Sequence, residues 1–80
     1  MMRAKTLKPV VTFATTSDAM AMEAEARAHG IPGRIIPVPS EIDAGCGLAW
    51  CAEADEKNAL MKGIEEHAIA YEGVFDVLLF

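Results

Sequence analysis

Apolar runs alternate with amphipathic stretches along the chain, and each half follows the same order of strand, helix and strand. A β-branched run at residues 10–14 (VVTFA) opens the pattern, and a helical period follows at residues 18–29. The remaining expected elements are strands at 34–38, 48–52 and 71–80 and a helix at 55–67. This βαββαβ order predicts an α+β, ferredoxin-like two-layer sandwich, in which two helices cover one face of a four-stranded antiparallel sheet.

Turn and capping residues set the expected ends of these elements. Thr16 or Ser17 can accept the free N–H groups of the first helical turn. Gly30 followed by Pro32 is typical of the end of a helix. Pro37 cannot donate a ladder hydrogen bond, which favours a sheet edge for its strand. The strand order 4-1-3-2 of a ferredoxin-like sheet also places that strand at an edge, so the two predictions agree.

The two predicted helices differ in how many apolar faces they have. The second has a single apolar stripe opposite charged residues, as expected of a helix that lies on a sheet. The first has two apolar faces, which are Met20, Ala21, Ala24 and Ala28 on one side and Ala19, Met22 and Ala26 on the other. One face is expected to cover the sheet. The other either meets a partner subunit or reflects only the loose pattern of an alanine-rich helix.

The apolar run at residues 77–80 (VLLF) has no polar alternation. An edge strand that is apolar on both faces is usually covered, so this run favours self-association as a homodimer or larger homo-oligomer.

Size and charge narrow the class of protein. Eighty residues give room for one domain, so residues 1–80 are predicted to form a single ferredoxin-like domain. Twelve acidic against seven basic residues give a formal charge of −5, and the absence of a basic run argues against nucleic acid and anionic membranes as partners. No apolar stretch approaches the ~20 residues of a membrane span. Two cysteines are too few for a disulfide framework, which indicates a reducing, cytoplasmic compartment.

The chain has no standard catalytic or cofactor-binding motif. It lacks a phosphate-binding glycine loop, HExxH and a serine nucleophile elbow, so no cofactor is predicted and enzymatic activity is at most that of a thiol-based carrier or transferase. A metal site would need nearly all of Cys46, Cys51, His29 and His67. His29 and His67 end different helices, which the expected topology places at opposite ends, so no metal site is predicted. A cation that interacts with the dipole in a last helical turn is sufficient to explain His29, and it is the favoured interpretation of His67.

Cys46 is the candidate reactive residue. Gly45 and Gly47 flank it and allow unusual backbone angles and close approach. Its loop joins the second and third strands and is expected beside the N-terminus of the first helix, whose partial positive charge favours a thiolate. The second helix is expected to end there too, which makes His67 a second candidate catalytic residue. The alternative is that Cys46 is an inert loop cysteine.

The other groups around Cys46 are interpreted as structural. Cys51 falls within a strand, where a cysteine is most often a small core residue, although a resolving role is the alternative. Five strand residues span roughly 16 Å, whereas a disulfide needs Cα atoms within about 7 Å, so a bridge from Cys46 to Cys51 is not expected. Glu41 and Asp43 would oppose a thiolate on Cys46, and solvated loop charges are the simpler interpretation of both.

Several segments between Val10 and Val74 form a specific combination. The segments are residues 11–13 (VTF), 30–39 (GIPGRIIPVP), Glu41-Ile42, 46–49 (CGLA), His67 and 71–74 (YEGV). This combination resembles the small bacterial family of selenium/sulfur carrier-like proteins. The resemblance implies a persulfide or perselenide on Cys46, with sulfur- or selenium-donating and accepting enzymes as partners. Gly45 stands where a small hydroxylated residue is common in the family, and Cys51 is not part of the pattern.

Two hypotheses from different classes follow. In the first, the protein is a sulfur or selenium carrier that uses Cys46. In the second, it is a non-catalytic ferredoxin-like interaction module that dimerises through the first helix or the last strand. A thiol–disulfide redox protein that uses Cys46 and Cys51 conflicts with the expected distance between them.

Overall fold

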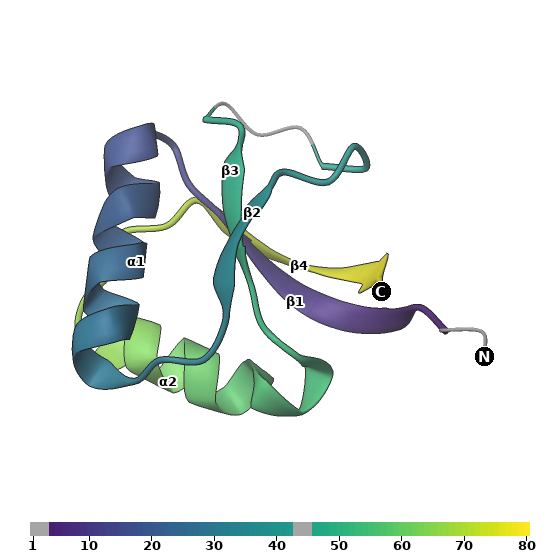
Figure 1. Cartoon of the computed structure of the whole chain (residues 1–80). Helices are drawn as coiled ribbons and strands as arrows, with labels where there is room; N and C mark the ends of the chain where they lie inside the picture. Colours follow the sequence, from purple (N-terminus) through teal and green to yellow (C-terminus); the bar gives the residue numbers. More distant parts are fainter. Residues whose placement is uncertain (1–3, 43–45) are drawn as a thin grey trace.

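Two α-helices cover one face of a four-stranded antiparallel sheet in the computed structural model, which describes residues 4–42 and 46–80 (Figure 1). The elements in chain order are β1 (Thr6–Thr12), α1 (Thr16–His29), β2 (Arg34–Pro37), β3 (Leu48–Cys51), the short 3-10 helix η1 (Ala54–Glu56), α2 (Lys57–Glu66) and β4 (Gly73–Leu79). The strand order β2-β3-β1-β4 is the predicted order read from the other edge. The predicted α+β two-layer sandwich is confirmed, and Pro37 lies in an edge strand as expected.

The first strand begins four residues earlier than its sequence pattern predicts, despite Pro9. The Pro9 carbonyl accepts a hydrogen bond from the Ala52 N–H at 3.2 Å, so it points toward β3. The nitrogen of a strand residue points to the same side as its carbonyl, so the N–H that Pro9 lacks would also have pointed toward β3. Pairing with β3 starts at Val10 and runs forward, whereas pairing with β4 extends back to Thr6. A proline is tolerated here because the ladder to β4 does not need its N–H.

Helix α1 is capped at both ends. Thr15, rather than the predicted Thr16 or Ser17, is the N-cap, because its hydroxyl accepts the Asp18 N–H at 3.1 Å. At the other end, Gly30 adopts φ 67° in the left-handed region, which confirms the predicted end of the helix.

The inward face of α1 is the one formed by Ala19, Met22 and Ala26, which are all buried. The face formed by Met20, Ala21, Ala24 and Ala28 is exposed to solvent. The helix therefore has one buried face and one exposed face, and the latter includes the large apolar side chain of Met20.

The main core lies between the helices and the sheet. Its buried members are Val11, Phe13, Ala19, Met22, Ala26, Ile31, Trp50, Ala52, Leu60, Ile64 and Ile69. A second, smaller cluster lies on the opposite face of the sheet and contains Val10, Ala49, Cys51 and Val77. Neighbouring residues of β1 and β3 thus point alternately into the two clusters, as expected of strands.

Helix α2 is short and lies across the C-terminal end of α1 (Figure 1). Ten residues of helix reach about 15 Å, and the segment 67–72 then leads back to β4. The Glu72 N–H donates to the Thr12 carbonyl at 2.7 Å, which starts the pairing of β4 with β1. As a result, α2 ends beside the end of α1 instead of running the full length of the sheet.

Among the described residues, the helices are too short or too polar to cross a membrane.

Candidate functional site

Cys46 lies at the end of the connection between β2 and β3, two residues before β3 begins. Gly47 adopts φ 78°, a left-handed conformation that glycine reaches without strain. The Val38 N–H donates to the Gly47 carbonyl at 3.1 Å and fixes the end of this connection to the end of β2. Cys46 itself is half-buried and packs against the main core, so its thiol is partly open to solvent. Asp43 and Gly45 lie outside the described residues.

Two backbone groups of Leu48 hold the Cys46 thiol. The thiol donates to the Leu48 carbonyl at a Sγ–O distance of 3.2 Å, and the Leu48 N–H donates to Sγ at 3.4 Å. The backbone of Leu48, two residues further along the same turn, therefore fixes the position of the Cys46 sulfur.

The Cys46 turn and the N-terminus of α1 lie at the same end of the sheet (Figure 1). Thr12, the last residue of β1, pairs with Ala49 near the start of β3, and α1 begins four residues after Thr12. Glu41, in the same connection, is exposed and accepts a hydrogen bond from the Ser40 hydroxyl at 3.0 Å. Its interpretation as a solvated loop charge is confirmed.

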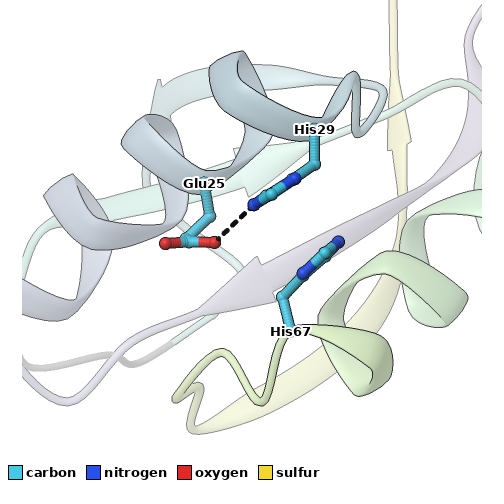
Figure 2. Close-up of side chains that lie close together, drawn as sticks. All are labelled: Glu25, His29 and His67. Carbon is cyan, nitrogen blue, oxygen red and sulfur yellow. Dashed lines mark ion pairs between the residues drawn. The ribbon is translucent and has the colours of Figure 1, made fainter.

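The two histidines lie together, so the prediction that they occupy opposite ends of the fold was wrong. The rings of His29 and His67 are stacked, with centroids 3.8 Å apart and planes 11° from parallel (Figure 2). The physical reason is the short α2, which stops beside the C-terminus of α1. For the same reason, His67 lies at the end of α1 that is remote from Cys46, and the structure does not bring these two residues together (Figure 1).

Glu25 joins the two histidines and was missed at the level of sequence. Its Oε2 lies 3.2 Å from the His29 Nε2, and both side chains are less than half exposed. The spacing of four residues on one helix places these side chains on the same face, so this pair could have been found from the sequence. The contact with His67 could not, because it depends on where α2 ends.

Cys51 is a core residue, as predicted. It is 1% exposed and belongs to the cluster on the sheet face opposite the helices. Burial raises the pKa of the Cys51 thiol, and the positive charges of Arg34 and Lys8 oppose this rise only in part. Cys46 packs against the other face, and both cysteines are free thiols.

These features define a small α+β sandwich protein with one partly accessible thiol on a backbone turn and a second thiol sealed in a core. Residues 8–76 match the family described as "Putative Se/S carrier protein-like", and the chain belongs to this family. A search of curated proteins and a search of solved structures gave no match.

Proposed function

We propose that the protein carries sulfur or selenium as a persulfide or perselenide on Cys46. The observation that carries this proposal is the half-buried Cys46 thiol, which a turn presents at one end of the sheet with the Leu48 N–H directed at its sulfur. Membership of a family described as Se/S carrier-like supports the same chemistry.

The loading step needs no oxidant. The Cys46 thiolate attacks the outer sulfur of a persulfide on a donor protein, and a new bond forms between that sulfur and Sγ. The donor's own S–S bond breaks, and the donor cysteine leaves as a thiolate. For selenium, the atom transferred is the selenium of a donor perselenide, and the balance is otherwise the same. Unloading is the same exchange with an acceptor thiolate.

Donor and acceptor enzymes are therefore the partners that this chemistry requires. The thiolate must stay reduced between transfers, so a reducing compartment such as the cytoplasm fits the proposal. The proposed transfer uses Cys46 without His67, because the His67 ring stacks on His29 at the other end of α1.

Mass spectrometry of the protein purified without reductant tests the proposal. We expect an adduct of roughly 32 mass units for sulfur or roughly 80 for selenium on the peptide that contains Cys46. The variant Cys46→Ser should lose the adduct and keep the fold, since this residue lies in a turn. Cys51→Ser is the matched control and should keep the adduct. Loss of the adduct in Cys51→Ser, together with its retention in Cys46→Ser, would contradict the proposal.

We further propose that the protein forms a homodimer through β4. This strand is an edge of the sheet, and its main-chain groups on that edge are open to pairing with a second copy. Leu7 of β1 and Leu78 of β4 pair across the two strands and remain 55% and 53% exposed. An antiparallel pairing of two β4 strands would cover part of this apolar surface.

A further inference from the structure

Glu25, His29 and His67 form a cluster of potential metal ligands at the C-terminal ends of the two helices (Figure 2). One ligand atom from each of the three side chains lies within 4.8 Å of the other two. The cluster combines residues from α1 with the residue that follows α2, so it exists only in the folded chain. It lies at the end of α1 that is remote from Cys46 and has no part in the carrier chemistry proposed above.

The backbone around these residues is fixed by packing. Glu25 and His29 are four residues apart on α1 and therefore share one face. Gly63 of α2 lies directly against Ile31, which follows α1. The His67 N–H donates to the Gly63 carbonyl at 3.1 Å, so the position of His67 follows from that of Gly63.

The rings remain accessible despite this packing. His29 and His67 both line a shallow surface hollow of about 240 Å³. The side chain of His29 is 42% exposed and that of Glu25 is 43% exposed, so solvent reaches both. A hydrated ion can therefore reach the ring nitrogens from solvent.

We propose that Glu25, His29 and His67 bind a divalent transition-metal ion of the Zn²⁺ type. Two imidazole nitrogens and one carboxylate oxygen are a ligand set that zinc uses when water holds its fourth position. Ca²⁺ and Mg²⁺ prefer all-oxygen sites and suit this set poorly. Around a tetrahedral zinc ion, ligand atoms lie about 2.0–2.2 Å from the metal and hence roughly 3.3–3.6 Å apart. The Glu25 Oε2 and the His29 Nε2 are already 3.2 Å apart, so the main movement needed is that of His67, and the stacked rings need to turn toward a common point.

The charges around the cluster are compatible with a cation. The chain carries a formal charge of −5. Lys62 lines the same hollow, but its Nζ lies 3.8 Å from a carboxylate oxygen of Glu66, which offsets its charge. A metal ion at this place ties the end of α1 to the end of α2, and binding that requires both helices stabilises the folded chain.

The test uses the full chain with both thiols removed, Cys46→Ser with Cys51→Ser, because cysteines bind zinc themselves. Calorimetric titration with Zn²⁺ should give one site per chain. At a Zn²⁺ concentration a hundred times the Kd, the melting temperature should rise by roughly 10–20 °C. In this background, His29→Ala and His67→Ala should each weaken binding at least tenfold. Glu65→Gln, an exposed carboxylate of α2 outside the cluster, is the matched control and should leave the Kd unchanged.

A second measurement does not depend on the folding of the histidine variants. Paramagnetic Co²⁺, added to the cysteine-free protein, should shift the ring proton signals of His29 and His67 together. The proposal is overturned if titration detects no saturable Zn²⁺ binding, if binding survives both histidine substitutions, or if Co²⁺ leaves the two ring signals unshifted. These outcomes do not affect persulfide loading of Cys46, so this proposal and the carrier proposal can fail separately.

Discussion

Gly63 of α2 lies so close to Ile31 that a Cβ atom on Gly63 would come within 2.7 Å of the Ile31 Cγ1. Real Cβ contacts are essentially never that short, so any larger residue at position 63 forces the Ile31 side chain or α2 to shift. Ile31 follows directly after the Gly30 that ends α1. One missing side chain thus allows α2 to reach the end of α1, and it is this approach that brings His67 onto His29.

Gly63→Ala should therefore destabilise the protein by roughly 1–3 kcal/mol, the usual cost of forcing extra atoms into a packed core. Alanine is favoured over glycine within a helix by about 1 kcal/mol, so the packing cost has to exceed this gain. Urea unfolding followed by circular dichroism measures the change. Lys62→Ala, at the neighbouring exposed position, is the control and should change the free energy of unfolding little. A more stable Gly63→Ala variant would show that the helices can separate at no cost.

The raised pKa of Cys51 makes stability depend on pH in a defined direction. The ordinary pKa of the thiol is 9.0, and burial raises it in the folded chain. As the pH rises through this ordinary value, the unfolded chain loses the thiol proton first and the folded chain keeps it. The contribution of Cys51 is therefore complete below about pH 9 and is lost as the pH rises through the folded-state pKa.

Comparison with Cys51→Ala isolates this effect from the other groups that titrate in alkali. The difference in free energy of unfolding between the natural protein and the variant should be constant near neutral pH and shrink above about pH 9. Urea midpoints at a series of pH values give this difference. A gap that stays the same into alkali would mean that the thiol titrates alike in both states.

The two thiols should differ widely in their rates of alkylation. Cys46 is half-buried in a turn, whereas Cys51 is 1% exposed in a core cluster. With iodoacetamide under native conditions, Cys46 should react first, and Cys51 should react only as fast as the chain opens. Peptide mapping at timed intervals separates the two. In urea both should react at similar rates, and equal rates without urea would contradict the burial described above.

Self-association through β4 predicts a dimer mass in light scattering at micromolar concentration. Leu78→Lys places a charge on the exposed apolar surface of the edge strand and should give a monomer. Met20→Glu places a charge on the exposed face of α1 and should leave the dimer intact. A monomer at every concentration refutes self-association, and dissociation by Met20→Glu alone would move the interface to α1.

The sequence predicted most of the fold because local signals and global topology agree. Gly30 adopts the left-handed conformation that ends α1, and Pro37 lies in an edge strand. The start of β1 was missed because a proline breaks only the ladder on the side to which its nitrogen points. Pro9 faces β3, so β1 continues along β4 on its other side. Which side a proline faces is decided by the sheet and not by its neighbours in sequence.

The candidate site was harder to predict than the fold. The place of Cys46 in a turn, with Gly47 beside it, followed from local sequence. The neighbours of His67 could not be predicted from local sequence, because in an ideal ferredoxin-like sandwich α2 runs along the full sheet. Here the contact between Gly63 and Ile31 and the length of α2 decide where the helix ends. This contact and this length result from tertiary packing, which the hydrophobic periodicity of the sequence does not reveal.

The placement of Cys46 and Cys51 against opposite faces of the sheet has a kinetic consequence. The chain has two cysteines, and the sheet stands between them. Under the carrier proposal, a persulfide on Cys46 would have no resolving thiol in its own chain, and its discharge would be a second-order reaction whose rate rises with the concentration of an acceptor. The lifetime of such a persulfide would be set by collision with other molecules, and dilution alone should prolong it.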